Sequence, residues 1–364
     1  MPDTDPALRR LIDQVKSAGS HATALDIRGG NTKAFYGEEQ QGAILDTTGL
    51  RGISVYEPTE LVITARCGTP LAELEATLAE RGQHLPFEPP HFAPGGTVGG
   101  MVATGLSGPS RAAIGSVRDF VLGATLLNGR GDVLRFGGQV MKNVAGYDVS
   151  RLLAGSMGTL GVILDVSLKV LPMANANATV RFQIDEATAL QRLNEWAAKP
   201  LPINASAWWS DTLVVRLRGA LAAVNAAIDA LGGDLIEADL GPPFWQGLRD
   251  HTDEFFEHAS KAVDGGATLW RLSVPSTTPP LKLHGETLVE WGGAQRWLVS
   301  AQPAAQVREA VKLAGGHATI FRGKDKSAGV FAPLAPALVR IHRNLKKSFD
   351  PASVFNPGRL YTGL

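Results

Sequence analysis

The sequence predicts an α+β protein of two domains, a glycine-rich first domain and a tryptophan-rich second domain. Of the 41 glycines among the 364 residues, 25 lie before residue 175, whereas all 7 tryptophans lie after it. Beyond residue 175, segments with strand-like alternation take turns with amphipathic segments of helical period, an order typical of an antiparallel sheet covered by helices. A chain of 364 residues also has about the length of two ordinary domains.

The domain boundaries follow from local composition. The strand-like run Val162–Leu171 ends in the small-residue stretch Pro172–Ala178, where we place the boundary. We therefore expect a first domain over residues 1–174 and a second, substrate-domain or cap-like α+β domain over residues 175–334. A C-terminal helix and tail, residues 335–364, are expected to return to the first domain.

The first domain opens with signals for a helix. Asp5 is a suitable N-cap, Pro6 fits the first helical position, and Gly19 is expected to end the helix. The pair Asn128-Gly129 between two apolar runs predicts a β-hairpin. Other strands are expected at residues 24–28, 43–46, 54–56 and 61–67, and a helix is expected to start at Thr69-Pro70.

The sequence of the second domain predicts two successive units with the order strand–helix–strand–strand–helix–strand, and each such unit is called a pass. The expected strands are residues 179–182, 205–209, 212–217, 234–237, 268–274, 296–300 and 318–321. The expected helices are residues 186–198, 220–231, 244–256 and 304–313, followed by a last helix over residues 335–347.

Charge and cysteine content exclude several classes of protein. The 35 basic side chains balance the 35 acidic ones, so no basic excess exists to bind nucleic acid. The single cysteine, Cys67, excludes an internal disulfide and an iron–sulfur cluster held by this chain alone, which needs about four thiolates. The acidic N-terminus shows no secretory signal, and the long uncharged run Phe92–Ser110 is too rich in glycine for a membrane helix.

A first glycine cluster follows a predicted strand directly. Two glycines in a row permit positive φ, so that successive N–H groups can point into one concavity that suits an anion. The alternative is an ordinary Gly-Gly turn. The candidate residues are Arg28, Gly29, Gly30, Asn31, Thr32 and Lys33.

A second cluster, Pro94–Gly100, is followed by Gly105 and Gly108. It has neither the G-x-G-x-x-G spacing of a Rossmann loop nor the G-x-x-x-x-G-K-[ST] pattern of an ATP loop. Its glycines are expected to leave space for a flat ring or a pyrophosphate. A side chain at Gly99, or at Gly30 in the first cluster, would then occupy the space of the ligand. The candidate residues are Gly96, Thr97, Val98, Gly99, Gly100, Gly105 and Gly108.

A third cluster, Gly155–Ile163, enters a predicted strand. It can present backbone amide edges to a nucleobase, or it can be the start of a bulged strand. The candidate residues are Gly158, Gly161, Val162 and Ile163.

Together with the tail segments Phe349–Pro351 and Phe355–Arg359, these clusters resemble the FAD-binding domain of the vanillyl-alcohol oxidase and p-cresol methylhydroxylase family. The resemblance implies an FAD-binding domain of p-cresol methylhydroxylase type with two small α+β subdomains. It also implies non-covalent FAD, with the amides of Gly29–Thr32 and Thr97–Gly100 on the pyrophosphate. Gly158–Ile163 would flank the adenine and Arg359 would approach the flavin.

A closer resemblance rests on Ser107–Arg111, Gly115–Asp119, Lys142–Asp148 and Gly315–Thr319. These segments are similar to the family of FAD-binding small subunits of bacterial glycolate oxidase. The resemblance implies oxidation of glycolate to glyoxylate within a complex, beside a second flavin subunit and an iron–sulfur subunit, with electrons passing toward the quinone pool. It also implies a cytoplasmic protein, or one held at the inner face of the cell membrane by these partners.

Arg111 and Arg118 have open roles. They either neutralise phosphate, or line the flavin ring, or pair with surface carboxylates.

The catalytic group is not evident from the sequence. Flavin enzymes of this family that oxidise D-lactate or glycolate resemble one another at a His-x-x-Asp-Gly-Asn-x-His stretch. Here only His317 follows two glycines, so His317 is the one weak catalytic candidate. The alternatives to a complex subunit are a self-sufficient FAD-dependent D-2-hydroxy-acid dehydrogenase and a structural subunit that keeps the flavin fold to brace its partners.

Metal and covalent flavin sites are not expected. His251 and His258 are seven residues apart, or about 10.5 Å along a helix, which is too far for one ion. Asn31 stands where tethered members of the family carry a histidine, and Cys67 reads as a small buried residue rather than a flavin anchor.

Overall fold

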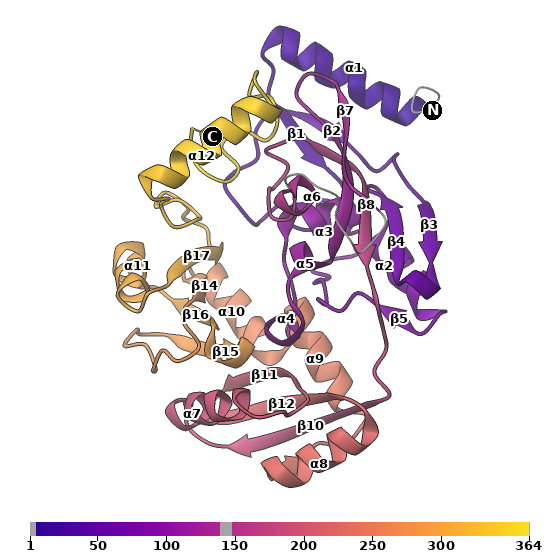
Figure 1. Ribbon diagram of the computed structural model, residues 1–364. Helices are drawn as coiled ribbons and strands as arrows, with labels where there is room; N and C mark the ends of the chain where they lie inside the picture. The colour runs from indigo at the N-terminus through magenta and orange to yellow at the C-terminus, as the bar shows by residue number, and fades with distance from the viewer. Residues whose placement is uncertain (1–4, 139–147, 364) are drawn as a thin grey trace. The chain divides into compact units, whose positions relative to one another are not determined.

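The structure is a computed structural model that describes residues 5–138 and 148–363, and it divides into two compact units (Figure 1). Unit 1 comprises Met1–Leu106, Ser116–Pro172 and Pro333–Leu364, and unit 2 comprises Ser107–Gly115 and Met173–Ala332. Most of the segment Lys142–Asp148, which contributed to the resemblance to glycolate oxidase small subunits, lies outside the described residues.

The described part of unit 1 contains three separate sheets. A parallel pair joins β1 (Leu25–Arg28) to β2 (Ala43–Asp46), and Phe355 of the C-terminal tail forms a parallel bridge to Leu25. An antiparallel five-stranded sheet has the order β3-β4-β8-β6-β7. Its strands are β3 (Ile53–Glu57), β4 (Val62–Arg66), β6 (Val121–Leu127), β7 (Val133–Gly137) and β8 (Val162–Lys169). Short strands β5 (Gln83–His84) and β9 (Leu171–Pro172) pair separately.

Three of the helices described in unit 1 begin within two residues of a predicted start, and three others were not predicted. In α1 (Pro6–His21), the Asp5 carboxylate accepts from the amides of Ala7 and Leu8, as expected of an N-cap. The helix continues past Gly19 to end at Ala22, because a glycine inside a helix costs only about 1 kcal/mol and the buried stripe extends to Ala18. The other helices are α2 (Leu71–Ala79), α3 (Val98–Thr104), α5 (Val117–Phe120), α6 (Val149–Leu152) and α12 (Pro336–Phe349).

Unit 2 is built on one antiparallel sheet of eight strands in the order β13-β10-β12-β11-β15-β16-β14-β17 (Figure 1). The four strands of the first predicted pass form one half, and the three expected strands of the second pass form the other half together with the unexpected β15. The halves join where Ala207 and Trp208 of β11 pair with Glu290 and Val289 of β15. The strands are β10 (Ala176–Gln183), β11 (Ile203–Trp209), β12 (Thr212–Gly219), β13 (Asp234–Leu235), β14 (Thr268–Ser273), β15 (Glu286–Glu290), β16 (Gln295–Ser300) and β17 (His317–Arg322).

Helices pack on both halves of this sheet. In the first half, α7 (Glu186–Ala197) and α8 (Leu221–Leu231) share a core with Leu213 and Val215. In the second half, α11 (Ala304–Leu313) packs against Trp270. The described part of unit 2 also includes the short helix α4 (Arg111–Ile114).

In the second half of the sheet, a loop connects β14 to β15 at the position where the first half has the helix α7. The guanidinium of Arg296, 1% exposed, donates to the carbonyl oxygens of Thr278, Pro279 and Gly293. This buried cation fixes residues 274–285 beside the sheet. The strand β15 that follows was not among the expected strands.

The expected helix over residues 244–256 is wrong, because two helices meet there. α9 (Gly241–Asp250) ends at His251, which adopts the left-handed conformation with φ 58°, and α10 (Glu254–Asp264) begins after the N-cap Asp253. The His251 ring stacks on Phe256 with centroids 3.6 Å apart, and burial lowers its pKa well below the usual value, with Arg322 and Arg271 adding to the effect. Within residues 5–138 and 148–363, no group of three or more His, Cys, Asp or Glu side chains is arranged to hold a metal.

The N-cap Asp253 generates a pH-dependent stability prediction. Burial raises the pKa of Asp253 to about 6, with Glu254 and Glu257 adding to the effect. The folded protein then binds this proton more tightly than the unfolded chain, so the wild type loses stability as the pH rises from about 4 to about 6. Asp253→Asn keeps a good N-cap that cannot ionise. We expect it to exceed the wild type by about 2 kcal/mol in free energy of unfolding above pH 6, and to lose this advantage near pH 4.

Urea unfolding across that pH range measures the difference. The matched control is Asp185→Asn at the N-cap of α7, where the bond from Thr188 lowers the pKa of the exposed carboxyl instead. The control should show no gain above pH 6. Equal stability of Asp253→Asn and the wild type at pH 8 would refute the prediction.

Candidate functional site

Four segments of unit 1 that are distant in sequence line one cavity, whose empty volume of about 770 Å³ includes space open to solvent. They are the loop after β1, the start of α3, the turn that leads into β8, and the tail after α12. The lining residues are Ile27, Arg28, Gly29, Gly30, Asn31, Thr32, Lys33, Ala34, Gln40, Thr47, Cys67, Thr97, Gly99, Gly100, Ala103, Thr104, Met157, Gly158, Gly161, Val162, Ile163, Asn356 and Arg359. Most of the predicted cofactor residues are therefore brought together.

The loop after β1 has the properties of an anion site. The backbone amides of Gly30, Asn31 and Thr32 donate to no acceptor among residues 5–138 and 148–363. Lys33 beside them is 8% exposed, and its Nζ lies 3.9 Å from the position that a Cβ on Gly96 would take. Three neighbouring donors and one ammonium group at a cavity wall fit a pyrophosphate.

The amides at the start of α3 were expected to donate to a pyrophosphate, but most of them donate to acceptors within the chain. Three of the four amides from Thr97 to Gly100 are already used within the chain, so they are not free donors for a pyrophosphate. The bonds run from Val98 N to Thr69 O (2.9 Å), from Gly99 N to Cys67 O (2.8 Å) and from Gly100 N to Thr97 Oγ1 (3.3 Å).

Several glycines of the cavity lie where two of its walls come into close contact. A Cβ on Gly30 would lie 1.6 Å from the carbonyl oxygen of Gly95, and one on Gly99 would lie 2.6 Å from the Cβ of Cys67. The expectation that side chains at Gly30 and Gly99 would displace only a ligand is therefore wrong, because protein atoms occupy that space. At Gly100, by contrast, only Thr97 Oγ1 comes within 4 Å of an added Cβ, at 3.2 Å.

The turn into β8 supplies a strand edge. Pairing of β4 with β8 ends at Arg66 and Asp165, and one further bond joins Cys67 N to Leu164 O at 2.9 Å. On the other side, β6 continues along the first two residues of β8, Val162 and Ile163. The edge of these two residues beyond the end of β4 lines the cavity, and such an edge suits the polar rim of a nucleobase.

The tail contributes Asn356 and Arg359. Arg359 is 4% exposed and donates to the carbonyl oxygens of Ala34, Tyr36 and Glu38, so it holds the loop over residues 34–38 in place. Burial lowers the pKa of this guanidinium, an effect that the carboxylates of Asp26 and Glu38 oppose.

Some site residues were missed by the sequence reasoning. Asn356 and Met157 were visible only as members of the runs Phe355–Arg359 and Gly155–Ile163, and Gln40 and Thr47 have no signal in the sequence.

The remaining predicted cofactor residues lie outside the cavity lining. Val98 is fully buried in the core, Gly96 accepts from Leu71 N, and Gly105 ends α3 with φ 62°.

Two of the predicted cofactor-binding residues, Gly108 and Arg111, belong to unit 2. Gly108 O accepts from Trp291 Nε1 at 3.1 Å, and the guanidinium of Arg111 lies 4.6 Å from the centroid of the Trp291 ring. The structure thus assigns Gly108 and Arg111 to a contact with Trp291.

The cavity holds neither a reactive thiol nor a histidine among the described residues. Burial raises the pKa of the Cys67 thiol to about 12, so the thiol stays protonated. The catalytic candidate His317 lies in unit 2, opposite Ser273 at the start of β17. Burial and then Arg271 lower the pKa of His317, so it is neutral near neutral pH.

Comparison with known proteins places this site in a family. Residues 8–137 match an FAD binding domain. Glycolate oxidase subunit GlcE of Escherichia coli is 49% identical over 354 residues, which cover 97% of each chain. Glycolate oxidase subunit GlcD of Bacillus subtilis is 28% identical over 222 residues, which cover 59% of this chain and 47% of that one.

Among solved structures, alkyldihydroxyacetonephosphate synthase superposes with a TM-score of 0.65 at 14% identity, over 96% of this chain and 75% of the other. This match shows a shared fold and confirms the predicted fold class. No helix in the described parts of the chain combines the length and apolar content that a bilayer crossing requires.

The name of the Escherichia coli relative identifies that protein as one part of a multi-subunit enzyme. The match at 49% identity extends over nearly the whole of both chains, and the site geometry and the FAD-domain match agree with it. The chain therefore belongs to the glycolate oxidase subunit GlcE family, and it is an FAD-binding oxidoreductase subunit.

Proposed function

We propose that this chain is an FAD-carrying subunit of a glycolate oxidase, in which glycolate is oxidised to glyoxylate and electrons pass to an iron–sulfur subunit. The observation that carries the proposal is the set of three amides, Gly30 to Thr32, that have no acceptor in the described chain and lie beside the buried Lys33. The loop supplies hydrogen-bond donors and positive charge, and no acidic side chain lines the cavity among the described residues.

Each wall has a part in holding FAD. The loop from Gly30 to Lys33 would bind the pyrophosphate, and the edge of Val162 and Ile163 would meet the adenine. Two features favour non-covalent attachment: the Cys67 thiol stays protonated, and Asn31 offers no nucleophile. FAD, when bound, supplies the two-electron acceptor, and the protein supplies its position and surroundings.

The cavity lining also supports a reaction whose catalytic base and iron–sulfur cluster come from other subunits. Oxidation of a 2-hydroxy acid requires a base for the hydroxyl proton, usually a histidine or a carboxylate. Within the described residues, the lining offers neither. The one cysteine of the chain cannot hold a cluster alone. A second flavin subunit similar to GlcD would then provide the base, and a third subunit the iron–sulfur cluster.

The first test concerns the cofactor. The purified chain, supplied with flavin, should show the near-ultraviolet and visible absorption bands of an oxidised flavin, because the proposed site retains the dinucleotide on the protein. Acid precipitation should release FAD, and not FMN, into the supernatant, since the attachment is non-covalent. Chromatography of the supernatant measures this. A pellet that retains the flavin would refute non-covalent attachment, and absence of any flavin after reconstitution would refute the proposal.

The second test uses Gly100, which lines the cavity and where the nearest atom to an added Cβ is Thr97 Oγ1 at 3.2 Å. Gly100→Val should raise the dissociation constant for FAD by about tenfold or more, because the new methyl groups fill space beside the cavity wall. Titration of the apoprotein, followed by quenching of flavin fluorescence, measures the constant. The matched control is Gly49→Val in unit 1, where the nearest atom to an added Cβ is the Ala7 Cβ at 3.6 Å. If both variants bind FAD like the wild type, the cavity is not the cofactor site.

The third test concerns the division of labour. The FAD-loaded chain alone should oxidise glycolate and D-lactate negligibly, since its cavity offers no base among the described residues, and activity should appear on addition of a GlcD-like subunit and an iron–sulfur subunit. Stopped-flow absorbance after mixing with glycolate measures flavin reduction directly. Rapid reduction in the isolated chain that is lost in His317→Ala would instead show a self-sufficient 2-hydroxy-acid dehydrogenase.

A further inference from the structure

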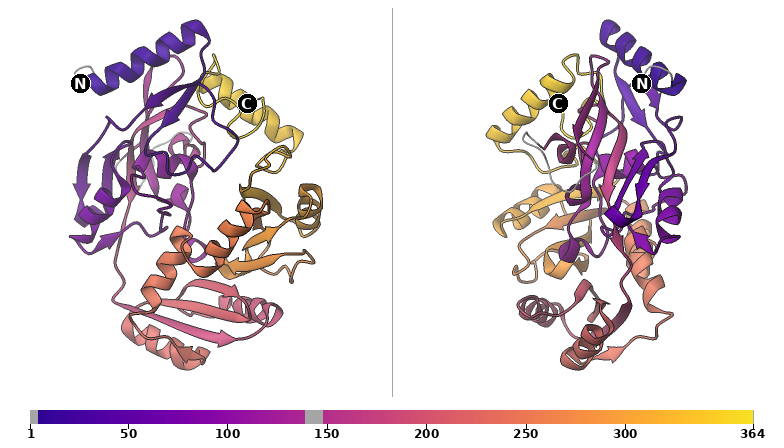
Figure 2. Two further views of the ribbon diagram at one scale, coloured as in Figure 1. Left: turned by 180° about the vertical axis from the view of Figure 1, so that it is seen from behind. Right: turned by 45° about the vertical axis from the view of Figure 1, so that its right-hand side comes forward.

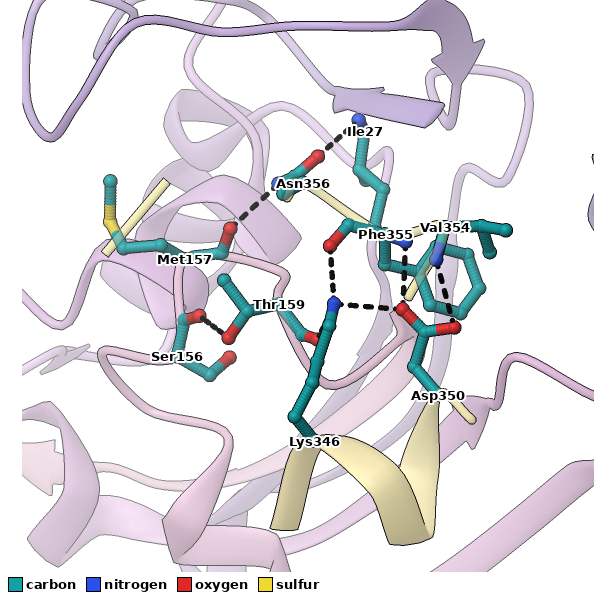
Figure 3. Close-up of polar contacts among 9 residues, drawn as sticks. All are labelled: Ile27, Ser156, Met157, Thr159, Lys346, Asp350, Val354, Phe355 and Asn356. Carbon is teal, nitrogen blue, oxygen red and sulfur yellow. Dashed lines mark hydrogen bonds and ion pairs between the residues drawn. The ribbon is translucent and has the colours of Figure 1, made fainter. Parts of the chain in front are cut away.

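Lys346 and Asp350 form a buried ion pair (Figure 3). Neither residue belongs to the cavity lining. The side chain of Lys346 in α12 is 8% exposed and that of Asp350 is fully buried, and Nζ of Lys346 lies 2.8 Å from Oδ2 of Asp350. Nζ also donates to the carbonyl oxygens of Thr159 at 2.8 Å and Phe355 at 2.7 Å. The three donors of the ammonium group are thereby all used.

Asp350 organises the turn that follows α12. Its Oδ1 accepts from Val354 N at 3.1 Å, and its Oδ2 accepts from Phe355 N at 2.8 Å. The turn is also attached to the hairpin between β6 and β7, because Gly129 N donates to Phe349 O at 2.9 Å. The carboxylate thus fixes the direction in which the tail leaves the helix.

The tail then passes along β1 to the cavity. Leu25 N donates to Val354 O at 2.7 Å, and Asn356 N donates to Leu25 O at 2.9 Å. The Asn356 side chain joins two cavity walls, since its Oδ1 accepts from Ile27 N at 2.8 Å and its Nδ2 donates to Met157 O at 2.7 Å. Both views of Figure 2 show the yellow C-terminal segment returning to the part of the chain that contains the earlier, indigo strands.

The ion pair is therefore one residue away from the cavity on two sides. Thr159 follows Gly158, and Phe355 precedes Asn356, and both neighbours line the cavity. Loss of the Lys346 ammonium would release both carbonyl groups at once and would leave the Asp350 carboxylate buried without its cation. Lys346 therefore supports the same two walls that the bond from Asn356 Nδ2 to Met157 O joins directly at 2.7 Å.

We propose that Lys346 and Asp350 are positioning residues for the cofactor, which set the affinity for FAD by fixing the spacing of these two walls. The inference rests on the proposed FAD site in this cavity. Neither side chain lines the cavity, so their effect is transmitted through the backbone of Thr159 and Phe355.

The experiment compares FAD binding by apoproteins in a fluorescence titration. Lys346→Met should raise the dissociation constant by about tenfold or more, because both walls lose their common support. Lys346→Arg should recover most of the affinity, since it keeps the charge and the donors. Lys346 also lines a second pocket, open to solvent, beside Leu345 and Leu360, into which the larger group can extend.

The matched control is Arg296→Met in unit 2. Arg296 is also a buried cation that donates to three carbonyl oxygens, but it holds a loop of the other unit. The control should lower thermal stability and leave the dissociation constant for FAD within about twofold of the wild type. A merely structural role of Lys346 would make the two variants behave alike.

Should Lys346→Met fail to fold, the double variant Lys346→Gln/Asp350→Asn takes its place in the experiment. The double variant buries no charge and keeps a polar side chain at both positions. Its affinity for FAD should also fall, with an altered visible circular dichroism of the flavin at saturation. Wild-type affinity in a variant of lowered thermal stability would overturn the inference and leave the proposed function intact. Failure of the wild-type apoprotein itself to bind FAD would refute the proposed function instead.

Discussion

Close approach of main chains around the cavity is the constraint on which the rest of unit 1 depends. Gly30 lies against the carbonyl of Gly95, and Gly99 lies against Cys67, at distances that leave no room for a Cβ. Backbones this close determine which polar groups find partners. The amides of Val98 and Gly99 reach acceptors at the end of β4, whereas the loop from Gly30 to Thr32 is held in a conformation that leaves its amides without an acceptor in the described chain.

The same constraint explains how far the sequence predicts the site. Clusters of glycine identify segments in which something must come close to the backbone, and three of the four cavity walls were found in this way. A sequence does not say what comes close. At Gly30 it is the backbone of Gly95, at Gly99 it is Cys67, and at Gly100 it is the hydroxyl oxygen of Thr97. Asn356 acts through a bond to Ile27, 329 residues away, and no local pattern encodes such a contact.

The fold of unit 2 was predictable where local periodicity is strong. The two passes of strands and helices form the two halves of one sheet, as the alternation indicates. The prediction failed at the junction of α9 and α10, where the helical period continues but Asp253 offers the N-cap of a new helix. It also missed β15, whose neighbouring loop depends on Arg296. Arginine is rarely buried, so no local pattern indicates that this one is.

The tail that carries Asn356 and Arg359 follows the whole of unit 2 in the sequence, yet it completes a cavity whose other walls are all encoded before residue 164. A ribosome synthesises the chain from its N-terminus, so the cavity is incomplete for the entire time in which unit 2 is being made. On the proposal that this cavity holds FAD, capture of the cofactor follows translation of unit 2. Substitutions that slow the folding of unit 2 can then lower flavin loading in the cell without altering any group that touches the flavin.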